Sequence, residues 1–137
     1  MRAVSATDPS AHGADALEGA WVAIGARLAA RELALEDLRV RYLLLHGGLY
    51  RIVDRSNRVV DGGHYEIDPA RSPPSIDIIG EHGPGAGRTL LAIYHLAGEE
   101  LTVCYDLERP ERPAHLEPAP GEPLLRITYA RAGGVSG

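Results

Sequence analysis

Residues 89–106 read TLLAIYHLAGEELTVCYD, two apolar runs of strand length on either side of the turn Ala97-Gly98-Glu99. This arrangement predicts a β-hairpin, because glycine readily adopts the positive φ that tight hairpin turns require. Side chains alternate between the two faces of a strand, so the two runs also predict which residues share a face. The hairpin therefore indicates both the fold class and the side of the sheet that faces the interior.

One face of this hairpin is more apolar than the other, and we expect it to point inward. It carries Tyr94 and Tyr105 beside Ala92 and Val103. A phenol ring combines an apolar body with a polar tip, which suits the orientation of a mostly hydrophobic small molecule. The alternative is that the tyrosines simply fill a closed core. The full inward set is predicted to be Leu90, Ala92, Tyr94, Leu96, Leu101, Val103 and Tyr105.

Similar apolar runs recur along the chain, separated by clusters of Gly, Pro, Asn and Asp. About eight short strands joined by tight turns predict an all-β fold, an antiparallel up-and-down barrel around an apolar interior. In a third run, alternation groups Tyr65 with Gly63 and Ile67, which makes Tyr65 another candidate lining residue. The predicted strands are Ala20–Leu28, Val40–Leu45, Leu49–Asp54, Val59–Ile67, Ser75–Ile79, Thr89–Leu96, Leu101–Asp106 and Leu124–Arg131.

One segment departs from the strand pattern. Residues 31–38 are good helix formers, with Leu35 and Leu38 three positions apart, and predict a short helix. Such a helix would serve either as a lid over one mouth of the barrel or as a plain connector.

Length and charge limit the classes of protein to consider. A chain of 137 residues predicts one domain, here residues 17–131, with a disordered leader at 1–16 and a disordered tail at 132–137. The net charge of −5 argues against a nucleic-acid partner, which clustered cations would bind. The chain shows no secretory signal and no apolar run long enough for a spanning helix, so we expect a cytoplasmic protein without a membrane partner. A homodimer is left open.

The opening Leu17-Glu18-Gly19-Ala20-Trp21 resembles the Gly-x-Trp start of lipocalin-like barrels, in which the ring plugs the closed end. With the motifs that follow it, residues 17–131 resemble an uncharacterised bacterial lipocalin-like domain family that is abundant in planctomycetes. The resemblance implies the barrel fold and no particular activity. Those motifs are Gly63–Pro69, Pro74–Ile78, Gly87–Tyr94, Gly98–Cys104 and Arg112-Pro113.

The resemblance also implies structural roles for Gly19 and Trp21. An arginine of the last strand, Arg126 or Arg131, would pack against the ring by cation–π contact. The Pro-containing loop Glu108–Pro113 departs from the common family pattern and has no assigned role.

Two carboxylates are candidates for acid–base chemistry. Glu66 shares a strand face with His64, although a solvated outer face is the alternative. Asp77 interrupts an apolar run, where a buried carboxylate must be paired, and Arg112, Arg126 and Arg131 are its natural partners. A structural ion pair and a proton-transfer role both fit this position.

Two further features carry weaker signals. Cys104 in mid-strand indicates a small buried hydrophobe rather than a nucleophile. The Gly-rich segment 81–88 ends in Arg88 but leads into a strand, so it predicts a loop at the barrel mouth rather than a phosphate cradle. The six histidines lack metal-ligand spacing, and we expect neither a metal nor a cofactor.

Three functions remain open from the sequence. The first is a binding module whose cavity holds a small, mostly hydrophobic molecule near Tyr65, Tyr94 and Tyr105, with Ala92 and Val103 in the wall. The second is a cofactor-independent cyclase or isomerase that uses the same cavity, with Asp77 or Glu66 as acid or base. The third is a barrel without a ligand that acts in protein interactions through its outer surface.

Overall fold

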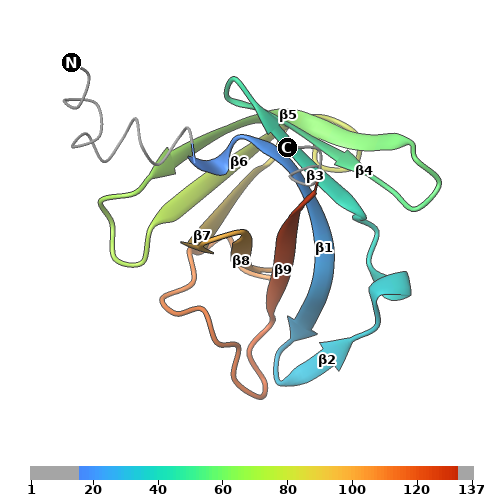
Figure 1. Ribbon diagram of the computed structural model, residues 1–137. Coiled ribbons are helices and arrows are strands. Elements are labelled where there is room, and N and C mark those ends of the chain that lie inside the picture. The colour runs from blue at the N-terminus through green and yellow to red at the C-terminus, as the bar shows by residue number, and fades with distance from the viewer. Residues whose placement is uncertain (1–15, 133–137) are drawn as a thin grey trace.

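The structure is a computed structural model that describes residues 16–132. Nine antiparallel strands form one sheet, which closes because β1 pairs with β9 (Figure 1). Eight strands make the barrel and follow one another in sequence order, whereas β2 is a short addition beside β1. The strands are β1 Gly19–Leu28, β2 Arg31–Leu33, β3 Tyr42–His46, β4 Leu49–Val53, β5 Val59–Asp68, β6 Ser75–His82, β7 Thr89–Ala97, β8 Glu100–Asp106 and β9 Leu124–Ala132.

This architecture confirms the prediction of an all-β, up-and-down barrel with lipocalin-like topology. The leader and tail predicted at 1–16 and 132–137 fall outside the described residues, apart from Ala16 and Ala132.

The short helix predicted over residues 31–38 is wrong. Its first residues form β2, and only Leu35–Asp37 make a 3-10 turn, η1, closed by the Leu38 N–H on the Leu35 carbonyl at 3.0 Å. Pairing with the last three residues of β1 offers β2 backbone hydrogen bonds, whereas an isolated helix of this length is marginal. Within residues 16–132, no helix is long and apolar enough to cross a membrane.

The β7–β8 register confirms the faces predicted for the hairpin. Ala92 lies opposite Tyr105 and Tyr94 opposite Val103, and these side chains belong to the barrel core or pack against it. The opposite face is not solvated as a plain outer face would be. Ile93 and Cys104 are buried there in a second, smaller cluster with Leu124.

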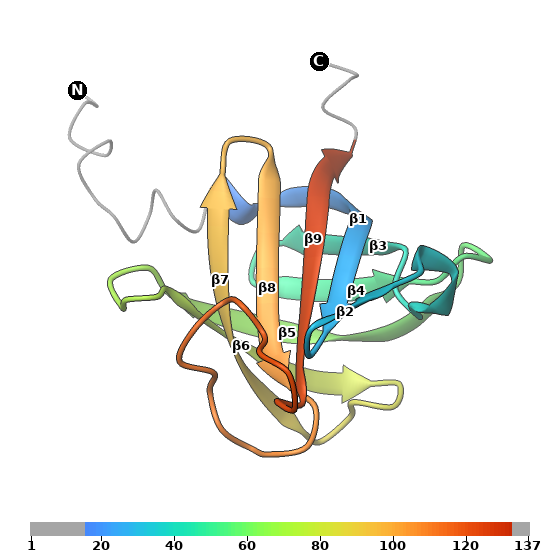
Figure 2. The ribbon, with the colours of Figure 1, turned by 90° about the horizontal axis from the view of Figure 1, so that it is seen from below.

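The covering segment of this second cluster is the long connection between β8 and β9, residues 107–123. It folds back across the outer face of β7 and β8 (Figure 2), where Leu116 packs on the cluster. Arg112 fastens it to the barrel, donating to the Ala92 carbonyl at 2.9 Å and pairing with Asp77 at 2.7 Å. The hairpin therefore has one face toward the interior and one beneath this segment.

The closed end of the barrel is plugged by Trp21, which is 0% exposed. Its indole N–H donates to the Leu17 carbonyl at 2.9 Å. Of the two arginines offered by the sequence, Arg131 covers the ring, 4.2 Å from guanidinium carbon to centroid. Arg126 lies elsewhere and pairs with Glu117 of the covering segment.

Only glycine fits at position 19, beside the Trp21 plug, for two reasons. Its φ is +129°, a conformation that side chains disfavour. A Cβ at Gly19 would also lie 3.0 Å from Nη1 of Arg131. The small residue therefore lets the guanidinium reach the ring and the nearby carbonyls of Glu18 and Ala16, at 2.8 and 2.7 Å.

Candidate functional site: an apolar cavity open at one end

The barrel encloses a cavity of about 800 Å³. This volume lies within the range of small-molecule sites, which are mostly apolar clefts of roughly 300–1,000 Å³. Trp21 is not part of the cavity wall, whereas the segments that follow β6 and β8 contribute Gly85 and Leu107–Pro110. Its aliphatic wall includes Leu43, Leu45, Ile76, Ile78, Val103 and Ile127.

Four tyrosines line the cavity: Tyr50, Tyr65, Tyr105 and Tyr129. Burial raises the pKa of Tyr105 to about 12 and raises the pKa values of Tyr65 and Tyr129 as well. Each phenol therefore stays protonated near neutral pH and keeps a hydrogen to donate. The interior is apolar over most of its wall but offers hydrogen-bond donors to a ligand.

The five ligand-binding residues proposed from the sequence do not all reach this space. Tyr65, Tyr105 and Val103 line the cavity. Ala92 and Tyr94 are buried in the barrel core at 0% and 4% exposure but are not part of the cavity wall. A role in binding stays a prediction for the three that line it.

Sequence reasoning missed two of the lining tyrosines. Tyr50 and Tyr129 each alternate with polar neighbours, Arg51 and Thr128, and with an inward isoleucine two positions away. The alternation applied to the hairpin would have found both residues.

The polar group at the open end centres on Asp61. Its carboxylate accepts a hydrogen bond from the Tyr50 hydroxyl and another from Nη2 of Arg39, each at 3.2 Å. Burial together with the charge of Asp61 raises the pKa of Tyr50 to about 12. The carboxylate is well shielded, with a 12% exposed side chain, whereas the Arg39 side chain is 51% exposed.

The loop between β6 and β7, for which the sequence predicted a place at the barrel mouth, packs against Asp61. Gly85 lies close enough that a Cβ would sit 3.3 Å from a carboxylate oxygen of Asp61. A Cβ at Gly80 would meet the Gly85 carbonyl at 2.0 Å, so the loop closes only with glycine there. Because of this close packing, the loop forms part of the cavity mouth.

The opposite side of the mouth is held by Asp106 at the end of β8. One carboxylate oxygen accepts the backbone N–H groups of Glu108 and Arg109 at 2.9 and 2.7 Å. The other accepts Nε of Arg109 at 2.7 Å. Desolvation acts to raise the pKa of Asp106, but these hydrogen bonds outweigh it and hold the pKa below its usual value. They fix the start of the covering segment at the rim.

The two candidate catalytic carboxylates lie on the outer face of the barrel. Glu66 and Asp77 are directly opposite each other on β5 and β6, and neither lines the cavity. Glu66 is exposed, and Asp77 pairs with Arg112. The prediction of an acid or base inside the cavity is therefore not supported at these positions, because both alternate with inward residues such as Ile76.

The remaining polar candidates are also remote from the cavity. His64 contacts Glu81 at 2.6 Å rather than Glu66. Cys104 is 0% exposed in the outer cluster, and burial raises its pKa to about 11. Within residues 16–132, no group of three or more His, Cys, Asp or Glu side chains is placed to hold a metal ion.

Comparisons with known proteins add no assignment. No family model, no curated protein and no solved structure matches this chain.

Proposed function

We propose that this protein binds a small, mostly hydrophobic molecule inside its barrel. The observation that carries this proposal is the cavity of about 800 Å³ enclosed by aliphatic and tyrosine side chains. Protein interiors are close-packed, and unfilled volume lowers stability by about 24 cal/mol per Å³ in mutational series. A fold that keeps so large an apolar space open at one end is well suited to a ligand.

The expected affinity follows from the apolar surface that a ligand would bury. Burying about 300 Å² gains about 7.5 kcal/mol at roughly 25 cal/mol per Å². The loss of translational and rotational freedom offsets part of this gain, whereas hydrogen bonds from the tyrosine hydroxyls add to it. A dissociation constant on the order of micromolar is the reasonable expectation.

We also propose that the chain belongs to the bacterial lipocalin-like family that its sequence resembles. The barrel with strands in sequence order and the Trp21 plug beside Gly19 support this proposal. The cavity supports binding more than either alternative function. A ligand-free barrel needs no such space, and catalysis would need reactive groups other than Glu66 and Asp77.

A pair of adjacent substitutions tests the binding proposal. Leu90 lines the cavity, whereas Leu91, its neighbour on β7, does not. Leu90→Trp therefore places a larger ring inside the cavity, and Leu91→Trp adds the same ring to the other face of the strand.

The readout is the fluorescence of N-phenyl-1-naphthylamine, a neutral apolar probe that brightens out of water. We expect saturable binding of one probe per chain in the unchanged protein and in Leu91→Trp, and a loss of at least about tenfold in affinity in Leu90→Trp. Equal binding by both variants, or no saturable binding by the unchanged protein, would refute the proposal. Circular dichroism confirms that each variant is folded.

A further inference from the structure

We propose that the ligand is a lipophilic amine, whose ammonium group binds Asp61 at the open end while its apolar body fills the barrel. This inference rests on the proposed function and adds the charge class of the ligand. Four observations support it. Asp61 has unused hydrogen-bond acceptor sites, and its ion pair with Arg39 is weak. Tyrosine rings line the same cavity, and the charged residues at its mouth favour a cation.

Asp61 has room for another hydrogen-bond donor. An ionised carboxylate offers about four acceptor sites, and Asp61 uses two of them in bonds of 3.2 Å. Asp106, the other shielded carboxylate of the mouth, accepts three shorter bonds and is held by its own loop. Of these two shielded carboxylates, Asp61 is therefore the one that a ligand can engage.

Arg39 is a partner that an ammonium group can displace. It contributes one nitrogen at 3.2 Å rather than a two-pronged contact, and its side chain is 51% exposed. A single contact from a side chain that lies half in water holds an ion pair only weakly. On displacement the guanidinium remains in water, whereas the ligand gains burial of its apolar body.

The side chains around Asp61 also favour a cation. Tyr50 donates to Asp61, and the rings of Tyr50 and Tyr105 line the same cavity. A cation within about 6 Å of a tyrosine ring is attracted by the negative face of its π system. A shielded carboxylate next to two phenol rings is a combination suited to an alkylammonium group.

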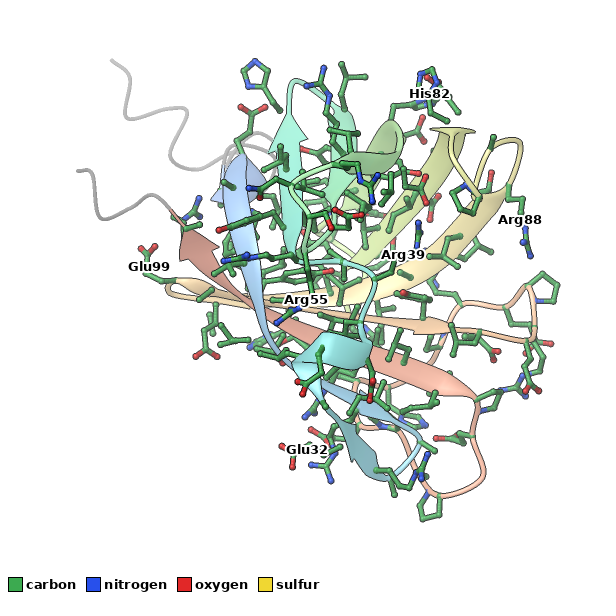
Figure 3. The ribbon with its side chains drawn as sticks, turned by 90° about the vertical axis from the view of Figure 1, so that its right-hand side faces the viewer. Glu32, Arg39, Arg55, His82, Arg88 and Glu99 are labelled. Atoms are coloured by element: carbon green, nitrogen blue, oxygen red, sulfur yellow. The ribbon has the colours of Figure 1, made fainter. Side chains whose placement is uncertain are left out.

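The charge balance of the mouth does not favour an anion. Four carboxylates and three guanidinium groups line the opening, and the whole chain carries −5, so the field attracts cations. Arg109 is engaged by Asp106, and Arg88 projects from the periphery, away from Arg39 (Figure 3). The charged residues that line the mouth are Asp37, Arg39, Asp61, Arg88, Asp106, Glu108 and Arg109.

The test uses decylamine, 1-decanol and decanoate, which share one chain length and differ in charge. Each is titrated against the protein loaded with N-phenyl-1-naphthylamine at neutral pH. We expect decylamine to displace the probe with a dissociation constant at least about tenfold below that of 1-decanol, and decanoate to bind more weakly than 1-decanol.

Two isosteric variants locate the effect. Asp61→Asn should abolish the advantage of decylamine while leaving 1-decanol unchanged, which also shows that the cavity is intact. Glu66→Gln removes the same charge from the exposed outer face and should leave all three affinities unchanged.

The other outcomes overturn the inference in distinguishable ways. Tightest binding by decanoate, lost in Arg39→Gln, would show an anion site at the guanidinium. Equal binding by all three would leave the proposed function standing without a charged subsite. Failure of all three to displace a bound probe would overturn this inference alone, whereas failure of the probe to bind would overturn both proposals.

Discussion

At the closed end of the barrel, Trp21 is fully buried. Arg131 contacts the Trp21 ring, donates to two backbone carbonyls and pairs with Glu99. At the open end, Asp61 keeps spare acceptor sites, its partner Arg39 is half exposed, and the space below is unfilled. Each end has an arginine and an aromatic side chain: Arg131 covers Trp21, whereas Arg39 and Tyr50 both donate to Asp61. The difference indicates that one end stabilises the fold, whereas the other is left available for a ligand.

The largest expected effect comes from removing the plug. Trp21→Ala should lower the free energy of unfolding by about 3–5 kcal/mol, because it empties a fully buried site. Tyr105→Ala, at the wall of the existing cavity, should cost clearly less, about 1–2 kcal/mol. Urea unfolding followed by circular dichroism measures both. Equal losses would remove the distinction between the two ends.

A smaller difference in stability is expected between variants of the two arginines. Arg131→Met keeps an apolar stem over Trp21 but leaves the carbonyls of Glu18 and Ala16 without their donor. It should cost about 1–3 kcal/mol. Arg39→Met, which breaks a half-exposed ion pair, should change stability by less than about 1 kcal/mol. A larger loss in Arg39→Met than in Arg131→Met would contradict this ranking in the same unfolding experiment.

Acid should lower the stability of the folded state by protonating Asp106 at the rim of the cavity. Because its pKa is held below the usual 3.8, its ionised form stabilises the folded state above that pH, and this contribution is lost as pH falls through the lower folded-state pKa. Asp106→Asn should therefore be less stable near neutral pH, with a shallower loss as the pH falls below 3.8. Unfolding midpoints across this range test the slope, with Glu66→Gln as the exposed carboxylate control. Parallel acid profiles for Asp106→Asn and the unchanged protein would refute the role of Asp106.

The smallest expected effect concerns Cys104 beneath the covering segment. Burial raises its pKa to about 11, so the native thiol should remain unlabelled by iodoacetamide at about pH 8. Labelling should become fast only after unfolding in urea. Mass spectrometry of the native and unfolded protein counts the modified chains. Rapid labelling of the native protein would show that residues 107–123 open readily.

Alternation of side chains predicted most of the fold and part of the cavity. It gave the register of the β7–β8 hairpin and the inward positions of Tyr65 and Tyr105, because these depend on local geometry alone. The prediction that rested on helix propensity failed at residues 31–38, where the first residues pair with β1 instead.

Local sequence patterns could not predict which polar residues meet at the cavity mouth. Arg39 and Asp61 come together from a connecting segment and from β5, and neither residue type nor spacing indicates their contact. Asp77 shows the same limit. Its need for a partner was foreseen, but its choice of Arg112 depends on how residues 107–123 cross the barrel.

A crystal structure of the protein grown with N-phenyl-1-naphthylamine would show whether the barrel holds a small apolar molecule. We expect density for the probe inside the barrel, against Tyr105 and Tyr129 and below Asp61. Probe density confined to the outer surface, or an interior closed by side chains that leave no space for it, would show that the barrel is not a binding cavity.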